Sequence, residues 1–418
     1  MRTVLAILIS ALLLTGCDRR ESKVVFAVGG APAELAVWEA LAADFRRETG
    51  IAVEVLRQPA DTSQQRQNLI LALKAELANP DVFLMDVAWV GLFAASGWLE
   101  PLTGVDSSPF FERVIAGVDT WQGELVALPV YMDGGLLYYR TDLLERFGRG
   151  GPPATWPELL ADCLAVQPAL REDAPGFWGF VWQGAQYEGL VTSFLEFAGS
   201  EGGFVREDGR IRLDLPANRE ALTFMRDLIW RYRVSPPSTY TEMKEEEVRL
   251  AFQQGEALFE RNWPYAWHLH QQPGSPVAGK VGIARPPAPA GGRAVSTLGG
   301  WHIAVSRFSD RKREALEFLR FVTSRQGQRR LVLALGWNPG RQDLYGEPEI
   351  LERMPNLREL KEVFRHARPR PALPYYTQAS EITQRHLNGA LAGRDEPGEA
   401  LRRAEAEIAD LLARYRIE

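Results

Sequence analysis

The sequence predicts an α/β protein built from more than one domain. Its 418 residues correspond to two or three domains of ordinary size. Short apolar runs alternate with longer segments in which apolar residues recur at helical spacing. Loops rich in Gly and Pro at 148–157 and 284–293 interrupt this alternation. Strands and helices in alternating order are typical of a sheet that carries helices on both faces.

The first hundred residues show the alternation most clearly. Strands are predicted at 24–28, 51–56 and 81–85, and helices at 33–48 and 63–77. In the first helix Leu35, Trp38, Leu41 and Phe45 share one face, and Gly50 ends the pattern. A β-α-β-α-β order predicts a mostly parallel sheet.

The rest of the chain continues in the same way. Further strands are predicted at 125–130, 257–261 and 302–305. Further helices are predicted at 157–169, 216–232, 245–254, 311–323, 379–391 and 396–414. Several of these helices begin with proline, which suits the first helical turn because an N–H there has no partner within the helix.

Composition excludes several classes of function. The chain carries 48 Lys and Arg against 54 Asp and Glu, a net charge of −6. A nucleic-acid-binding protein would need a basic surface to neutralise phosphates, so no nucleic-acid partner is expected. Two Cys and five His are too few for a disulfide framework or a Cys-based zinc site, and we expect neither a metal nor a cofactor. The 12 Trp are unusual, because they outnumber the 11 Tyr.

The N-terminus resembles the export segment of a bacterial lipoprotein. Arg2 precedes an apolar run at 4–14 that is too short to span a bilayer. Leu-Thr-Gly-Cys, ending at Cys17, resembles a lipobox and implies cleavage of residues 1–16 and lipidation of Cys17. Residues 17–23 would then be a lipidated tether, which anchors the protein to the cell membrane, facing the periplasm or the cell exterior. The alternative is an ordinary signal peptide with an incidental Cys.

Carboxylates, aromatic side chains and glycines follow or flank several predicted strands. Ligands of open α/β sheets lie beyond the carboxyl ends of the strands, so these positions are candidates for a binding site. The candidate residues are Glu34, Asp86, Tyr131, Asp133, Trp263, Tyr265, Gly300, Trp301 and Arg370. Carboxylates and Arg form directed hydrogen bonds to sugar hydroxyls, and Trp and Tyr offer flat apolar surfaces to the C–H face of a sugar ring.

Six stretches carry a family resemblance. They are FAVGGAP at 26–32, DVFLMDVAW at 81–89, LPVYMDGGLLYY at 128–139, FERNWPYAW at 259–267, TLGGWH at 297–302 and RPALPYY at 370–376. In this order they resemble family 1 of the extracellular solute-binding proteins of carbohydrate ABC importers, most closely the trehalose- and maltose-binding proteins. The resemblance implies that the nine candidate residues contact a disaccharide, and that a permease and its ATPase receive it.

The resemblance also implies the architecture. This is the two-lobed type II periplasmic-binding-protein fold, with discontinuous lobes, a hinge and the ligand cleft between the lobes. Lobe 1 would comprise 24–128 plus 283–325, and lobe 2 would comprise 133–279 plus 331–418, with hinge segments near 126–133, 279–283 and 324–331. The protein is expected to be a monomer and not an enzyme. One departure is Ala60, where the family tends to have a small hydroxyl residue that Thr62 could replace.

Alternatives stay open for several of these residues. Asp86 can cap a helix that begins at 87, Glu34 can complement the dipole at its helix start, and Arg370 can form an ion pair within one lobe. Asp86 and Asp133 can also be the two carboxyls of a glycoside hydrolase. The same fold can bind sucrose, a longer glucan, a monosaccharide or a polyol in place of trehalose or maltose.

Overall fold

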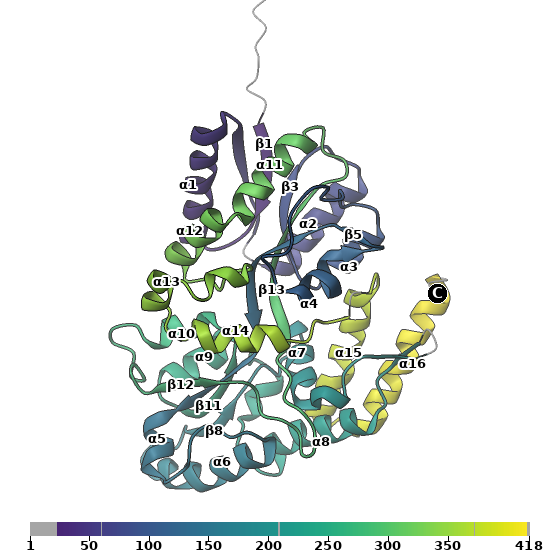
Figure 1. Cartoon of the computed structure of the whole chain (residues 1–418). Coiled ribbons are helices and arrows are strands. Elements are labelled where there is room, and N and C mark those ends of the chain that lie inside the picture. The colour runs from purple at the N-terminus through teal and green to yellow at the C-terminus, as the bar shows by residue number, and fades with distance from the viewer. Residues whose placement is uncertain (1–22, 60, 208–209, 372, 416–418) are drawn as a thin grey trace, which may run out of the picture.

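The computed structural model describes residues 23–59, 61–207, 210–371 and 373–415. The predicted signal peptide at 1–16, the lipidation site Cys17 and the departure at Ala60 lie outside these described residues. Figure 1 shows two lobes stacked one above the other and joined by extended segments. The N-terminal strand belongs to the upper lobe, and the C-terminal helices pack on the lower lobe.

The first lobe is built on a five-stranded sheet of order β2-β1-β3-β13-β6. Its strands are β1 (Lys23–Val28), β2 (Ala52–Arg57), β3 (Val82–Asp86), β6 (Leu128–Gly134) and β13 (Leu298–Val305). The helices of this lobe are α1 (Pro32–Thr49), α2 (Thr62–Lys74), α3 (Val90–Ala95), α4 (Glu112–Val114), α11 (Lys312–Thr323) and α12 (Arg325–Leu335). A short hairpin of β4 (Thr120–Trp121) and β5 (Glu124–Leu125) precedes β6.

Alternation along β1 explains why helices cover both faces of this sheet. Phe26 packs with Trp38 of α1 and Phe318 of α11, at ring-centroid distances of 5.2 Å each. Its neighbour Ala27 faces the opposite side and joins the apolar cluster that contains Leu69 of α2. Successive side chains of a strand point to opposite faces, so a strand buried on both sides reads as one continuous apolar run.

The second lobe is built on a four-stranded sheet of order β12-β7-β11-β8. Its strands are β7 (Leu136–Arg140), β8 (Trp178–Val181), β11 (Ala257–Asn262) and β12 (Val281–Ala284), and β9 (Val205–Glu207) with β10 (Arg210–Arg212) forms a separate hairpin. Its helices are α5 (Thr141–Arg146), α6 (Trp156–Arg171), α7 (Glu188–Ala198), α8 (Pro216–Trp230), α9 (Glu245–Gln253), α10 (Tyr265–His270), α15 (Tyr376–Leu391) and α16 (Pro397–Tyr415).

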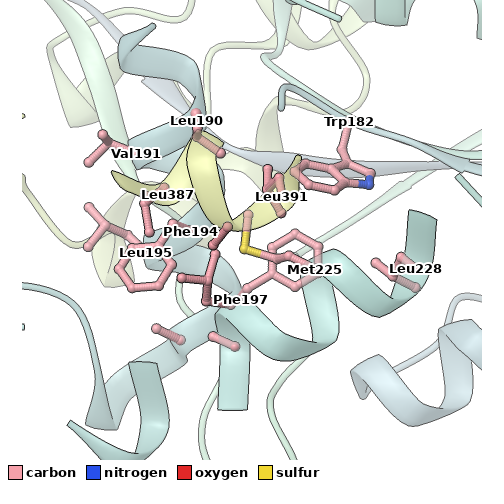
Figure 2. Close-up of a cluster of buried hydrophobic side chains, with 14 of the residues drawn as sticks. Trp182, Leu190, Val191, Phe194, Leu195, Phe197, Met225, Leu228, Leu387 and Leu391 are labelled. Carbon is pink, nitrogen blue, oxygen red and sulfur yellow. The ribbon is translucent and has the colours of Figure 1, made fainter. Parts of the chain in front are cut away.

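The core of the second lobe gathers side chains from distant parts of the sequence. Figure 2 shows Phe194 and Phe197 of α7 beside Met225 of α8 and the α15 residues Leu387 and Leu391. All of them are almost completely buried. Helix α7 is covered on every side, and every residue from 189 to 198 is buried. No helix was predicted at these residues.

The first sheet is mostly parallel, as predicted, with β13 as its antiparallel strand, and the structure corrects the predicted hinge segments. Strands β1, β2 and β3 are parallel as expected, but β13 is antiparallel to both β3 and β6, because it returns from the other lobe. Strand β6 belongs to the first sheet up to Gly134, and β12 pairs with β7 in the second sheet. Ala288 still pairs with Thr155 of the second lobe, so the second crossing lies between Ala288 and the start of β13 at Leu298, and not at 279–283.

The third crossing also lies later than the predicted segment at 324–331. Helix α12 occupies Arg325–Leu335 and contacts α1 and α11 of the first lobe. The chain then runs along β6, where the Met132 N–H donates to the Asn338 carbonyl at 2.9 Å. Helices α13 (Pro348–Arg353) and α14 (Leu357–His366) follow, and the chain enters the second lobe at α15. Lys23, expected in the tether, is the first residue of β1.

Candidate functional site

One row of residues crosses the edge of the first sheet. Trp301 of β13 pairs with Asp86 of β3 on one side and with Tyr131 of β6 on the other. Directly opposed residues of antiparallel strands project from the same face, so the sheet places a carboxylate, an indole and a phenol side by side. Asp133 lies two residues along β6, opposite Gly299. Four predicted residues are thus neighbours because of strand register alone.

The carboxylates around Tyr131 act on its phenol. Burial raises the pKa of Tyr131 well above its usual value, and the charges of Asp133, Glu34 and Asp86 raise it further. Tyr131 therefore stays a neutral phenol that can donate or accept a hydrogen bond. Trp337, from the third crossing, stacks on Tyr131 at a ring-centroid distance of 4.2 Å.

Two glycines allow close packing at this edge, Gly300 within the first sheet and Gly299 against the second lobe. Gly300 has φ of +120°, which disfavours other residues, and a Cβ there would overlap the Tyr131 carbonyl oxygen. A Cβ on Gly299 would lie 3.1 Å from the Trp263 ring, which belongs to the second lobe. The close approach at Gly299 is thus between Trp263 and the first sheet.

Trp263 and Tyr265 follow strand β11 and differ in environment. The Trp263 Nε1–H donates to Glu245 at 3.3 Å, and its ring lies 4.1 Å from the Arg261 guanidinium. Tyr265 is 36% exposed, and its hydroxyl donates to Glu246 at 2.6 Å. Burial of the hydroxyl and the Glu246 hydrogen bond raise the pKa of Tyr265. Tyr265 is the most exposed of the predicted aromatic residues.

Arg370 joins the two lobes through two carboxylates. Its Nη2 lies 3.1 Å from Asp86 of the first lobe, and its Nη1 lies 3.0 Å from Glu188, at the start of α7 in the second lobe. Tyr376 donates to the same Glu188 carboxylate at 2.6 Å, and Ser380 donates to it as well. Burial alone would lower the pKa of Arg370, but Asp86 and Glu188 outweigh burial and raise it. The ion pair lies between lobes, not within one.

A cavity of about 290 Å³ lies beside this ion pair. Both lobes line it, with Thr62, Arg66, Asp86, Ala88, Trp89, Gln186, Tyr187, Glu188, Arg370, Tyr376, Thr377, Glu381 and Gln384. Of the nine predicted ligand residues, only Asp86 and Arg370 line the cavity. The prediction missed Arg66 and Glu188, which lie on helices where nothing in the local pattern marks a binding residue. Among these lining residues, Trp89 lies edge-on to the ring of Trp301, at a ring-centroid distance of 5.4 Å.

Local hydrogen bonds also hold two of the predicted carboxylates, but only Glu34 acts at a helix start, because the helix after Asp86 begins at Val90 and not at 87. The Glu34 carboxylate accepts the Ala31 N–H at 2.8 Å and so satisfies a free donor at the start of α1. Asp86 Oδ1 accepts the Ala88 N–H at 2.8 Å. These local bonds fix where the carboxylates point, and each carboxylate keeps acceptor capacity for a ligand.

Chemically, the site combines hydrogen-bonding carboxylates and an Arg with several flat aromatic surfaces. In the part of the chain that the structure describes, no three His, Cys, Asp or Glu side chains are arranged to hold a metal ion. Cys163 is buried in the second lobe, and burial raises the pKa of its thiol well above the usual range. The polar and aromatic groups suit a neutral polyhydroxylated ligand.

Asp133 gives the site a pH dependence. Burial raises the pKa of Asp133 from 3.8 to about 8, and the charge of Asp86 adds to the effect. Between about pH 4 and pH 8 the folded state then binds more protons than the unfolded state, whose Asp ionises near 4, so stability falls as pH rises. We expect Asp133→Asn to flatten this fall, by at most about 1.4 kcal/mol per pH unit. Urea unfolding of the parent protein and of Asp133→Asn between pH 4 and pH 8 measures the free energy of unfolding. If the two proteins showed the same pH dependence, the assignment to Asp133 would be contradicted.

Among the described residues, no helix combines the length and the apolar character that crossing a bilayer requires.

Comparisons with known proteins agree with this geometry. The family model "Bacterial extracellular solute-binding protein" matches residues 29–329. A probable ABC transporter-binding protein of Deinococcus radiodurans is 34% identical, over 88% of each chain. The structure of maltose-bound T. maritima MalE3 is 37% identical with a TM-score of 0.84, over 93% of this chain and 100% of that chain. An α-D-tagatose-bound ABC transporter solute-binding protein of Thermotoga lettingae is 27% identical with a TM-score of 0.80, over 94% and 100%. The chain therefore belongs to the bacterial extracellular solute-binding proteins and has their two-lobed α/β fold.

Proposed function

We propose that the protein binds a disaccharide, such as maltose or trehalose, between its lobes and delivers it to an ABC permease. The observation that carries this proposal is the row of Asp86, Trp301 and Tyr131, which faces Trp263 and lies beside the cavity. A carboxylate next to an indole matches the alternating hydroxyls and C–H surface of a pyranose ring. The likeness to a maltose-bound protein supports the same ligand class.

The nine candidate residues are proposed as ligand contacts with different roles. Asp86 and Glu34 would accept from hydroxyls, Asp133 would donate or accept as a protonated acid below about pH 8, Arg370 would donate, and the aromatic residues would cover the ring faces. Thr62 lines the cavity, which supports the idea that its hydroxyl replaces the one missing at Ala60. Glu188, Arg66 and Gln384 join the proposed contacts because they line the same cavity.

Isothermal calorimetry with a sugar panel tests the proposal. We expect heat of binding with maltose or trehalose, and a melting temperature that rises with sugar concentration because sugar binds only the folded form. At a sugar concentration of about 100 Kd the stabilisation is about 2.7 kcal/mol. Absence of heat with maltose, trehalose and sucrose at millimolar concentrations would refute the disaccharide proposal. Binding of tagatose, a longer glucan or a polyol in the same panel would support the alternative ligands.

A carrier role is proposed over hydrolysis. The matching family model is one of solute-binding proteins, and the Deinococcus relative is named as a probable ABC transporter-binding protein, which supports a carrier. Release of glucose from maltose by the purified protein, lost in Asp133→Asn, would favour the hydrolase alternative.

Transport requires export, an anchor and a change of lobe arrangement. We propose that residues 1–16 are removed, that Cys17 is lipidated, and that a monomer serves the permease and its ATPase at the outer face of the cell membrane. Opening would be a rotation of the two lobes about the three crossings. The ligand would shift this equilibrium only by its difference in affinity for the closed and open forms.

The anchor makes its own prediction. We expect Cys17→Ser to move the protein from the membrane fraction to the soluble fraction, because acyl chains on Cys17 provide the attachment. Cell fractionation followed by immunoblotting measures this distribution, with Cys163→Ser as the control that keeps the anchor. A Cys17→Ser protein that stays with the membrane would contradict lipidation.

A further inference from the structure

A buried ion pair lies directly behind the proposed sugar site. Arg261 of β11 and Glu196 of α7 are 1% and 0% exposed, and they form a two-pronged pair with Nη2 to Oε1 at 2.7 Å and Nε to Oε2 at 2.8 Å. Gln183 accepts a further hydrogen bond from Arg261 at 3.3 Å. Removing two charges from water costs free energy, so apolar residues in place of Arg261 and Glu196 would stabilise the fold equally well. We therefore looked for a role of this ion pair other than stabilising the fold.

On one side, Arg261 supports an aromatic residue of the site. Its guanidinium carbon lies 4.1 Å from the centre of the Trp263 ring. A planar cation against an indole is attracted to the face of the ring and fixes the ring plane. The indole of Trp263 also donates a hydrogen bond to Glu245 and approaches Gly299 of the first lobe. Arg261 of the second lobe and Gly299 of the first lobe are thus both neighbours of the Trp263 ring.

On the other side, Glu196 holds the strands that cross between lobes. The Thr297 N–H donates to Glu196 Oε1 at 3.0 Å, one residue before β13 begins. The Thr297 hydroxyl donates to the Thr192 carbonyl of α7 at 3.0 Å. Gly135, between β6 and β7, leaves room for the pair, because a Cβ there would overlap both Glu196 and Arg261. The ion pair is therefore in contact with two of the three crossings.

We propose that Glu196 and Arg261 are positioning residues that fix the Trp263 ring relative to the β13 segment carrying Gly299 and Trp301. They would not touch the sugar. One side chain of the pair sets the plane of an indole in the second lobe, and the other sets the position of the strand that carries an indole in the first lobe. The effect on affinity rests on the proposed function, whereas the effect on the Trp263 ring does not.

The test is Arg261→Lys, which keeps the positive charge beside Glu196 but removes the planar fork. We expect sugar affinity to fall by about tenfold, because a desolvated cation–π contact has about this value. In a Trp263→Leu background the same change should have little further effect, because the ring through which Arg261 acts is gone. Equal loss of affinity in both backgrounds would overturn the proposal.

The chain offers a matched control. Arg171 lies 4.2 Å from the Trp178 ring, in the second lobe and outside the residues that line the cavity. Arg171→Lys makes the same chemical change in the same type of contact, and sugar affinity should stay within about twofold of the parent value. If Arg171→Lys lowers affinity as much as Arg261→Lys does, the effect is a general weakening of the fold and the proposal fails.

A second readout needs no sugar. We expect Arg261→Lys and Glu196→Gln to shift the indole N–H resonance of Trp263, identified by its loss in Trp263→Phe, in a ¹⁵N correlation spectrum. Glu196→Gln keeps the shape and the acceptor for Thr297, so it serves if Arg261→Lys does not fold. An unmoved resonance in both variants would overturn the positioning role. Absence of sugar binding by the parent protein would refute the proposed function and leave this readout intact.

Discussion

Trp301→Ala will lower disaccharide affinity by a factor of about 30 or more. Trp301 is the central member of the row across the sheet, between Asp86 and Tyr131, and its ring edge packs against Trp89. Truncation of a central aromatic anchor in a binding site costs about 2 kcal/mol or more. The flanking carboxylates would also lose the surface that keeps water from their hydrogen bonds. Calorimetric titration with the sugar that the parent protein binds measures the loss.

Trp230→Ala is the matched control for this prediction. Trp230 lies in the second lobe, is 44% exposed, and donates its indole N–H to the Leu391 carbonyl at 2.7 Å. We expect this variant to lose some stability and to keep the parent affinity. Native-like affinity in Trp301→Ala would remove Trp301 from the site.

Arg370→Met will remove both sugar binding and a large part of the attachment between the lobes. It leaves the carboxylates of Asp86 and Glu188 without their shared counter-charge. Removal of one partner from a buried ion pair costs about 3–5 kcal/mol, and the partial exposure of both carboxylates favours the lower end of that range. Urea unfolding measures the free energy of unfolding, and calorimetry measures the sugar affinity.

Arg66→Met provides the comparison for Arg370→Met. Arg66 on α2 also reaches across the cleft, to Glu381 on α15 at 3.5 Å, but 60% of the Glu381 side chain is exposed. An exposed ion pair contributes about 0–1 kcal/mol, so the stability of Arg66→Met should stay close to that of the parent. Equal destabilisation by the two variants would contradict the special position of Arg370.

The part of the site that lies on strands could be predicted from the sequence. Asp86 ends a buried run, Trp301 begins one, and Tyr131 lies on the strand between the lobes, so a sheet edge brings all three together. Helices α1, α2 and α6 of the first half were predicted within a few residues of their bounds, whereas α5 and α7 were not predicted. Strand β13 begins four residues before the predicted start, since its Gly-Gly pair is typical of a loop.

The part of the site that lies on buried helices could not be predicted. Glu188 begins α7, whose remaining residues are buried, and no helix was predicted there. Glu196 is on the same helix, and its partner Arg261 is 65 residues away in the sequence. Ion pairs between such distant segments depend on tertiary packing alone. The hinge segments were predicted at the wrong places for the same reason. Tertiary packing, and not the local sequence pattern, determines which lobe contains β12 and which contains α12.

The discontinuous core of the second lobe has a consequence for the order of folding. This core joins Leu137 near the start of the lobe to Leu401 and Ile408 on the last helix. During synthesis, the first strands of the second lobe can complete their core only after nearly the whole chain has been made, because some of their apolar partners lie on the last helix. The first sheet needs only Lys23 to Val305 for its five strands. We therefore expect the upper lobe to acquire structure first, and a chain shortened before α16 to expose the unfinished lower core to aggregation and proteolysis.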